Sequence, residues 1–286
     1  MKELTKVKFT NLEKILFPEL QIKKAQVIEY YIKIAPRILE FIAGRAIVIN
    51  RFPNGIDKLG FYEKDLPKGT PSWVERFEKY SETSQREINY VICNDLDTLL
   101  WLANLAAIEI HMPLSKTNSY ENPDLVLFDI DPEPPANFQD SIEVSFLLKE
   151  ILDGLGLKSY VKTSGKKGLH IVLPIVTKYN FKQTREFVHL IGKHLARESE
   201  LVVSEFSQSR DPETVYIDYR QNSSGRTMIS PYSLRAEKLA LVSTPIEWME
   251  LKKKLRPEEF NINSVLKREK VPWKGLWEQK QNLELD

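Results

Sequence analysis

The spacing of hydrophobic residues along the chain predicts a fold in which helices and strands are intermixed. Over about residues 24–43, apolar residues recur at intervals of three and four, the period of a helix with one buried face. Pro36 should kink or split this helix, and Gly44 should end it. Similar periodicity predicts helices at 95–108 (capped by Asn94), 138–153, 181–198 (capped by Asn180) and 245–254. Short apolar runs predict strands at 46–55 (ending in a turn), 61–64, 124–132, 159–163, 169–174 and 215–219, and a strand or an extended exit at 108–113. The fold class is therefore α+β or mixed α/β.

Two carboxylates interrupt the apolar run at 124–132. Asp129 and Asp131 are two positions apart, so on a strand their side chains point to the same side, and Pro132 ends the strand. Two like charges about 4 Å apart repel by roughly 4 kcal/mol at an effective dielectric of about 20. A divalent metal ion is the simplest compensation. The alternative is a pair of strand-end aspartates that cap a loop or pair with arginine.

A third carboxylate, Asp218, interrupts the later apolar strand at 215–219, where Tyr216, Asp218 and Arg220 would share a face. Three strand carboxylates directed at one point are what two divalent ions about 3.5–4 Å apart require for phosphoryl or nucleotidyl transfer. One ion would activate the attacking hydroxyl, and the other would neutralise the leaving pyrophosphate. The alternative is a surface carboxylate on an edge strand.

A basic glycine loop, Thr-Ser-Gly-Lys-Lys-Gly-Leu-His, occupies residues 163–170. Its glycines and serine allow backbone N–H groups to approach an anion closely, and its lysines add positive charge. The residue order is not that of a Walker A loop, and a strand follows it instead of a helix. A plain hairpin turn is the alternative. His170 is either a ligand contact or a satisfied structural residue.

Arginines accompany polar residues after the Asp218 strand. Arg220, Arg226 and Arg235 carry the planar guanidinium group that suits phosphate recognition, although they could also be solvated arginines of a polar loop. Phe61 and Tyr62 could stack on a base, but a core position is the default for aromatic side chains.

A few further residues carry weaker signals. Lys14, Lys23 and Lys24 form a small basic cluster that is either solvated or holds a DNA phosphate. His111 indicates little by itself. His189 and His194 lie on the predicted helix 181–198, and we expect them to be structural or solvent-facing.

Composition excludes several classes of protein. The chain has 286 residues, a formal net charge of +1 and one cysteine, Cys93. A nucleic-acid partner must therefore be held by local patches, and neither an internal disulfide nor a four-cysteine zinc site is possible within one chain. The N-terminus lacks the apolar region of a signal peptide, and no apolar run approaches the roughly 18 residues of a membrane span. We expect a cytoplasmic protein without a membrane partner, whose best internal seam is at 113–124.

Taken together, these stretches resemble the polymerase domain of bacterial ligase D and its stand-alone homologues, in the archaeo-eukaryotic primase superfamily. Each motif is weak alone, but nine of them stand in the family's order over about residues 9–240. They are 11–14 (Asn-Leu-Glu-Lys), 51–55 (Arg-Phe-Pro-Asn-Gly), 61–64 (Phe-Tyr-Glu-Lys), 110–113 (Ile-His-Met-Pro), 128–132 (Phe-Asp-Ile-Asp-Pro), 163–170, 215–218 (Val-Tyr-Ile-Asp), 221–222 (Gln-Asn) and 231–235 (Pro-Tyr-Ser-Leu-Arg).

The resemblance implies an α+β, primase-like catalytic core with mixed sheets flanked by helices and an RRM-like module that carries the aspartates. The chain would be one primase/polymerase domain, 1–286, with an N-terminal α/β part (1–120), a catalytic RRM-like part (121–245) and a C-terminal helical tail (246–286).

The resemblance also implies an activity. The protein would add nucleotides, preferably ribonucleotides, to a 3′ hydroxyl at gaps or broken ends in non-homologous end joining, with Mn²⁺ or Mg²⁺ in a two-metal site. Its partners would be DNA with a 5′ phosphate, NTPs or dNTPs, a separate DNA ligase and a Ku-type end-binding protein, and it would associate with the nucleoid. The alternatives are a primase that starts chains de novo, a non-catalytic module that bridges DNA ends, and a metal-dependent nuclease.

The family pattern finally implies roles for individual residues. The metal ligands would be Asp129, Asp131 and Asp218. The nucleotide would be bound by Arg51, Phe61, Tyr62, His111, Ser164, Gly165, Lys167, His170, Gln221, Arg226 and Arg235. Asn11, Lys14 and Lys24 would bind the DNA 5′ phosphate, and Arg210 would contact the DNA end. Asn50 is a departure, because some members have lysine there.

Overall fold

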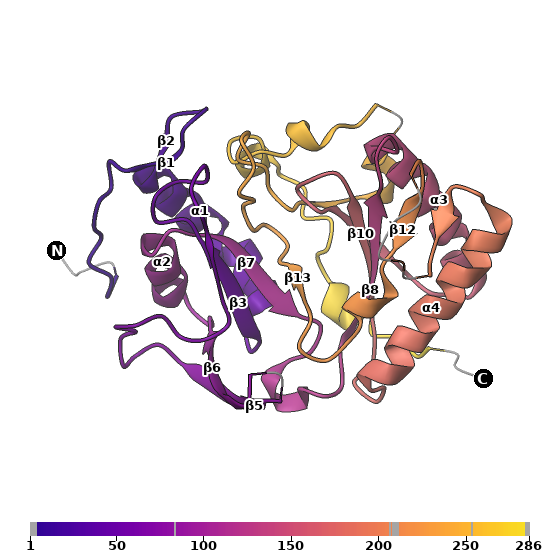
Figure 1. Ribbon diagram of the computed structural model, residues 1–286, viewed down its shortest axis with the longest axis horizontal. Coiled ribbons are helices and arrows are strands. Elements are labelled where there is room, and N and C mark those ends of the chain that lie inside the picture. Colours follow the sequence, from indigo (N-terminus) through magenta and orange to yellow (C-terminus); the bar gives the residue numbers. More distant parts are fainter. Residues whose placement is uncertain (1–4, 83, 206, 208–211, 253, 284–286) are drawn as a thin grey trace. The chain divides into compact units, whose positions relative to one another are not determined.

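The computed structural model describes residues 5–82, 84–205, 207, 212–252 and 254–283 (Figure 1). Contacts within the chain divide it into two compact units. Unit 1 comprises Met1–Pro113, Thr227–Ser243 and Phe260–Lys267, and unit 2 comprises Leu114–Arg226, Thr244–Glu259 and Arg268–Asp286. Each unit has its own sheet and helices, so the predicted α+β class is confirmed. Within the described residues, no helix is long and apolar enough to cross a membrane.

Unit 1 is built on an antiparallel sheet with the strand order β13-β7-β3-β6-β5, to which β4 is added beside β3, and β1 and β2 form a separate pair. Its strands are β1 (Ile15–Phe17), β2 (Ile22–Lys23), β3 (Ala46–Arg51), β4 (Phe61–Glu63), β5 (Arg76–Ser81), β6 (Arg86–Ile92), β7 (Ala107–Pro113) and β13 (Thr227–Ile229). Its helices are α1 (Lys24–Ile42), α2 (Leu96–Asn104) and the 3-10 turn η5 (Val265–Lys267).

Helix α1 is the first predicted helix, and it is not split by Pro36. Proline removes one hydrogen bond to the carbonyl four residues earlier, which here belongs to Ile32. Because Ile32 lies on the exposed side of the helix, with 45% of its surface accessible, water can replace that bond. The chain leaves the helix at Ala43, and Gly44 follows with a φ of 71°, so glycine supplies the left-handed conformation at the end.

Helix α2 corrects two details of the predicted helix 95–108. Its N-cap is Asp95, whose side chain accepts a hydrogen bond from the N–H of Thr98 at 2.8 Å, and not Asn94. It ends at Asn104, because the chain turns at Ala106 with a φ of 59° and then enters β7. The chain must turn here to enter β7, so the helix ends although the apolar pattern continues beyond it.

Unit 2 is built on a second sheet with the strand order β11-β12-β8-β10-β9-β14. Its strands are β8 (Leu125–Pro132), β9 (Tyr160–Thr163), β10 (Leu169–Pro174), β11 (Val202–Val203), β12 (Val215–Ile217) and β14 (Pro245–Ile246). Its helices are α3 (Phe138–Gly154) and α4 (Phe181–Glu198), with 3-10 turns η1 (Thr117–Ser119), η2 (Tyr219–Gln221), η3 (Trp248–Glu250), η4 (Pro257–Glu259) and η6 (Leu276–Glu278).

The central part of unit 2 has the chain order β8-α3-β9-β10-α4-β12, with antiparallel pairing in the spatial order β12-β8-β10-β9 (Figure 1). This βαββαβ arrangement is the one expected of an RRM-like module. Helices α3 and α4 both pack on β8. Phe128 of β8 contacts Phe187 of α4, with ring centroids 6.3 Å apart. Because side chains alternate along a strand, Asp129 and Asp131 point to the face opposite Phe128.

The predicted helix at 245–254 is wrong. Residues Pro245–Ile246 form β14, which pairs with Lys162 and Val161 of β9, and η3 follows. Pairing with the edge of the sheet satisfies the backbone of this segment, so long-range contacts override its local helical signal. In the described part of 246–286, the helical segments are all short 3-10 turns.

Candidate active site

Three aspartates lie on neighbouring backbone segments of unit 2. Asp129 and Asp131 are on β8, and their side chains are partly exposed, at 23% and 27%. The N–H of Asp218 donates to the carbonyl oxygen of Asp129 at 3.1 Å, so the third aspartate directly adjoins the first. The register of the β8–β12 pair, in which Tyr216 lies opposite Asp131, produces this proximity.

The structure corrects the predicted strand at 215–219. Strand β12 ends at Ile217, and Asp218 is the N-cap of the turn η2, where its side chain accepts from the N–H of Arg220 at 3.1 Å. Aspartate often bonds to nearby backbone in this way, which favours a turn over a continued strand. Tyr216 and Arg220 still reach Asp218, each with a side-chain contact of 3.3 Å.

Each of the three carboxylates contacts a basic side chain. Asp129 lies 3.3 Å from Nε2 of His170, Asp131 lies 3.2 Å from Nζ of Lys167, and Asp218 lies 3.3 Å from Nε of Arg220. The alternative for Asp129 and Asp131 was pairing with arginine, but their basic partners are histidine and lysine. A concentration of negative charge at this end of β8 requires positive partners, and the chain provides them.

The donor set suits a hard divalent cation, because Mg²⁺ and Mn²⁺ prefer carboxylate oxygens. Asp129, Asp131 and Asp218 fit such an ion in residue type and in the adjacency of their backbones. Across the described ranges, however, no group of three or more acidic, histidine or cysteine side chains is already gathered as a set of metal ligands.

The glycine loop is a hairpin between β9 and β10, so the simpler of the two alternatives describes its backbone. The N–H groups of Lys166 and Gly168 both donate to Oγ of Ser164, each at 3.2 Å, and Gly165 has a φ of 73°. The hydroxyl of Ser164 therefore fixes the shape of the loop.

Gly168 brings the loop against β8. A Cβ atom at this position would lie 2.3 Å from the carbonyl oxygen of Ile130, closer than any real contact, so only glycine fits. Nζ of Lys167 also donates to the carbonyl of Pro132 at 2.7 Å. The loop, His170 and the aspartates of β8 therefore form one site in unit 2.

The segment after Asp218 contributes the side-chain amide of Gln221 to the site and is anchored to β8 by Asn222. Nε2 of Gln221 donates to Asp218 at 3.4 Å. Asn222 is fully buried, accepts from the N–H of Leu127 at 2.9 Å and donates to its carbonyl at 2.6 Å. Arg226 is exposed at the end of this segment, with its N–H bonded to the carbonyl of Ser223 at 3.0 Å.

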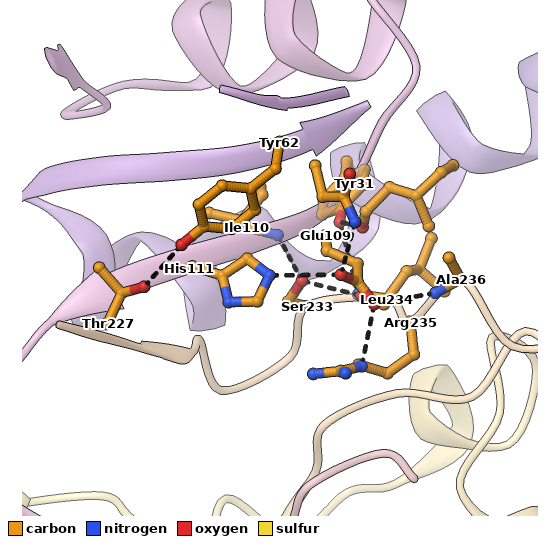
Figure 2. A network of polar contacts seen from close by, with 12 residues as sticks. Tyr31, Tyr62, Glu109, Ile110, His111, Thr227, Ser233, Leu234, Arg235 and Ala236 are labelled. Atoms are coloured by element: carbon orange, nitrogen blue, oxygen red, sulfur yellow. Dashed lines mark hydrogen bonds and ion pairs between the residues drawn. The ribbon is translucent and has the colours of Figure 1, made fainter. Parts of the chain in front are cut away.

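Unit 1 holds a second group of predicted nucleotide-binding residues (Figure 2). Phe61 and Tyr62 are 47% and 55% exposed, so neither ring takes the default core position. The ring of Tyr62 packs edge-on against His111 at 5.8 Å between centroids, and its hydroxyl lies 3.4 Å from that of Thr227. Arg51 lies over the ring of Phe61 at 6.0 Å.

Two cations of this group are already engaged with acidic residues. Arg51 forms a bidentate ion pair with Glu63, with Nε 2.7 Å from one oxygen. Arg235 lies 3.1 Å from Glu109, and His111 lies 3.3 Å from the same carboxylate. His111 and Arg235 are therefore brought together through a residue that the sequence analysis missed.

Glu109 is the missed residue. It is 5% exposed, and it is the one carboxylate set into the apolar strand β7. Burial by itself raises the pKa of Glu109, but the hydrogen bond from His111, the charges of Arg235 and His111 and the hydrogen bond from Asn50 hold that pKa well below its usual range. The pattern that singled out Asp129, an acid within an apolar strand, also marks Glu109.

The predicted DNA-binding lysines lie together near the N-terminus of α1. The N–H of Lys24 donates to the carbonyl of Lys14 at 2.8 Å. Nζ of Lys24 donates to the carbonyl of Thr10, and Nζ of Lys14 donates to Oδ1 of Asn54. Burial and the charge of Lys14 lower the pKa of Lys24. Asn11 adopts a left-handed turn with a φ of 52°, and its carbonyl accepts from the N–H of Lys14 at 3.1 Å.

The third member of the predicted cluster, Lys23, pairs with Glu13 at 2.6 Å. Arg210, the predicted DNA-end contact, lies outside the described residues.

Comparisons with known proteins identify a family. A family model described as "LigD, primase-polymerase domain" matches residues 23–274. The bifunctional non-homologous end joining protein LigD of Bacillus subtilis is 33% identical over 265 residues, which are 92% of this chain and 42% of the relative. The multifunctional protein LigD of Mycolicibacterium smegmatis is 30% identical over 257 residues, 88% of this chain and 33% of the relative. The chain thus spans less than half the length of these curated relatives.

A solved structure is also similar. The polymerase domain of Mycobacterium tuberculosis ligase D, in complex with DNA, matches with a TM-score of 0.84 and 29% sequence identity, over 92% of this chain and 94% of that one. The fold is therefore that of the primase-like polymerase domain of ligase D. With a family model that matches most of its length, the chain belongs to the LigD primase-polymerase family.

Proposed function

We propose that the protein is a template-directed nucleotidyltransferase that adds nucleotides to a 3′ hydroxyl at gaps or broken DNA ends. The observation that carries this proposal is the site in unit 2, where Asp129, Asp131 and Asp218 adjoin a basic glycine hairpin. Membership of the LigD primase-polymerase family supports a polymerase role. The names of the relatives, which are non-homologous end joining proteins, support a role in that repair process.

In this proposal, Asp129, Asp131 and Asp218 hold two Mn²⁺ or Mg²⁺ ions. When bound, the ions supply Lewis-acid stabilisation of the attacking and leaving oxygens. Lys167 and His170, which now contact the carboxylates, are the cations that we assign to the phosphate oxygens of the nucleotide. Ser164 and Gly165 set the shape of the hairpin that carries Lys167.

The residues of unit 1 have separate roles in the proposal. The exposed rings of Phe61 and Tyr62 stack on bases, because aromatic faces accept any base without sequence preference. His111, Arg51 and Arg235 provide positive charge for the nucleotide. In unit 2, Arg226 provides a further positive charge, and Gln221 offers its neutral side-chain amide. Lys14 and Lys24, with the turn at Asn11, bind a 5′ phosphate.

The test of this function compares DNA substrates and nucleotides in one assay. We expect faster extension on a gapped duplex with a 5′ phosphate than on a nicked or unprimed template, with NTPs preferred over dNTPs and with Mn²⁺ or Mg²⁺ required. Synthesis on unprimed single strands at an equal or higher rate would instead identify a primase. Failure to add any nucleotide, while DNA ends are still held together, would leave only an end-bridging module. A DNA ligase and a Ku-type protein are the partners that we expect in end joining.

The lysines near α1 give a separate prediction. Replacing Lys14 and Lys24 together by methionine keeps the aliphatic stems but removes two charged donors, so the preference for a 5′-phosphorylated gap over a 5′-hydroxyl gap should fall about tenfold or more. Activity on a simple primer end should be spared. Lys23→Met is the matched control, because Lys23 is adjacent but paired with Glu13. An equal loss on phosphorylated and unphosphorylated gaps would show that these lysines do not read the phosphate.

A further inference from the structure

The carboxylate of Asp218 is held by residues of its own turn. Among the described residues, its side-chain hydrogen-bond and ion-pair partners are Tyr216, Arg220 and Gln221, all within three positions of it. It also accepts from the backbone N–H of Arg220 at 3.1 Å. The carboxylate therefore moves together with the segment 216–221, and its direction depends on the contacts that fix this segment to the rest of unit 2.

A stacked pair of rings joins this segment to α4. The ring of Tyr219, the residue directly after Asp218, lies within 15° of parallel to the imidazole of His189, with the ring centroids 4.0 Å apart. Rings this close and this nearly parallel are in face-to-face contact, which restricts both the position and the tilt of Tyr219. The backbone N–H of Asp218 and the side chain of Asn222 both bond to β8, so the stack provides a separate anchor on a helix.

The imidazole of His189 is itself held at its edge. Its Nε2 lies 3.1 Å from Oε1 of Glu205, and Nζ of Lys193 lies 3.1 Å from the same oxygen. Lys193 is four positions after His189, so the two side chains lie on one face of α4 and share one partner. Glu205 follows β11 by two residues, so the ring that contacts Tyr219 is tied to the end of a strand as well as to its own helix.

Close packing of α4 brings this face of the helix to the turn. Gly192 lies three positions after His189, on the same side of the helix. A Cβ atom at Gly192 would lie 2.9 Å from Cβ of Ser204 and 3.8 Å from Cγ2 of Ile217, so a larger residue would push α4 away from Ser204. Ile217 directly precedes Asp218, and η2 also packs on α4. The helix therefore lies close enough for the imidazole to reach the ring of Tyr219.

We propose that the stack of His189 and Tyr219 positions Asp218 as a metal ligand, so that both are positioning residues of the active site. His189 acts through Tyr219, and Tyr219 acts through the backbone that it shares with Asp218. Neither ring contacts the metal ion or the nucleotide in this proposal. Residues behind the ligands of a metal ion orient those ligands, and their loss typically costs about 10- to 100-fold in metal affinity. The inference rests on the proposed function, because it assumes that Asp218 binds a metal ion.

The test is the binding of Mn²⁺ alone to the full chain, measured by electron paramagnetic resonance from the loss of the free-ion signal. Tyr219→Leu and His189→Leu, which keep apolar bulk but remove one ring of the stack, should each raise the dissociation constant for Mn²⁺ about tenfold. His189→Phe keeps a flat ring for Tyr219 but cannot bond to Glu205, and it should recover most of the affinity.

Two further variants separate positioning from a general loss of stability. His194→Leu changes the second histidine of α4, an exposed residue outside the stack, and should leave Mn²⁺ binding unchanged. Asn180→Ala removes the N-cap of the same helix, so it should lower the unfolding midpoint without changing the dissociation constant for Mn²⁺. If the stack only stabilised the fold, the affinity would instead follow the unfolding midpoint across all the variants.

Kinetics of nucleotide addition supply a second readout. The Mn²⁺ concentration that gives half the maximal rate should rise about tenfold in Tyr219→Leu, because a misplaced ligand weakens binding of the ion. The rate at saturating Mn²⁺ should fall less, and the KM for the nucleotide should change little. If Mn²⁺ binds too weakly for direct measurement without a nucleotide, this concentration decides the test.

The outcomes distinguish the inference from the function on which it rests. A wild type that neither bound Mn²⁺ nor added nucleotides would refute the proposed function, and the inference with it. Equal Mn²⁺ dependence of the wild type, Tyr219→Leu and His189→Leu would overturn the inference alone. A loss in His189→Phe as large as that in His189→Leu would overturn it too, because the bond to Glu205 would then matter and not the stack. The His189 variants decide if Tyr219→Leu fails to fold, since the side chain of His189 is 24% exposed.

Discussion

Asp129→Asn, Asp131→Asn and Asp218→Asn are each expected to reduce nucleotide addition at least about 10³-fold, because a catalytic metal site contributes several kcal/mol to transition-state stabilisation. Asparagine keeps the shape of each side chain but removes the charge that attracts a divalent ion. Folding should be little affected, since asparagine keeps a hydrogen-bond acceptor at each position and Asp129 and Asp131 are partly exposed.

The measurement is the rate of single-nucleotide addition on a gapped duplex, with the unfolding midpoint of each variant recorded in parallel. Asp153→Asn is the control, because Asp153 is an exposed carboxylate of α3 that pairs with Lys149. It should retain wild-type activity. If any of the three site variants added nucleotides at the wild-type rate, that residue would not be a metal ligand.

Asn222→Ala is expected to destabilise unit 2 by about 2–4 kcal/mol, because it leaves two buried backbone groups without partners. Strand β12 pairs with β8 only at Ile130, Asp131 and Pro132. At Leu127 the side chain of Asn222 takes over the role of a neighbouring strand, accepting from the N–H and donating to the carbonyl. The same side chain anchors the segment that carries Asp218 and Gln221, so activity should fall with stability.

Urea denaturation compares this variant with Asn180→Ala, which removes the N-cap of α4 and should cost about 1 kcal/mol. Asn222→Asp provides an intermediate test, because it keeps the acceptor but loses the donor. If Asn222→Ala were no less stable than Asn180→Ala, the proposed role of Asn222 as a substitute strand would be incorrect.

Local signals were sufficient where an element carries its own cap. Helix α4 spans Phe181–Glu198 as predicted, because Asn180 and Gln183 form a reciprocal capping box. Strand β8 ends at Pro132 as predicted, since proline cannot extend the ladder.

Local signals failed where tertiary contacts decide the outcome. The segment 245–254 carries a helical pattern, but Pro245 and Ile246 pair with the edge of β9. The partner of Pro245 in this pairing, Lys162, lies 83 positions earlier, so the segment itself does not reveal that edge. A second error is local: the apolar pattern predicts Asp218 on a strand, but its own side chain ends that strand by capping η2.

The sequence predicts those residues of the candidate site that stand out in a local pattern, but not those that long-range contacts bring together. An acid within an apolar strand identified Asp129 and Asp131, and the same signal could have identified Glu109, which alternates with His111 on β7. Its partner Arg235 could not be inferred, because the two residues are 126 positions apart and long-range contacts such as the pairing of β13 with β7 bring their segments together. The double bond of Asn222 to Leu127 is hidden in the sequence for the same reason.

The central claim is that this protein copies a template by adding nucleotides to a 3′ hydroxyl. The most direct measurement is insertion into a one-nucleotide gap with a 5′ phosphate, with each of the four template bases in turn and with the metal ion present or chelated. The account predicts insertion of the complementary nucleotide opposite each base, and no insertion after chelation. Insertion that ignores the template base, or that continues without the metal ion, would contradict it.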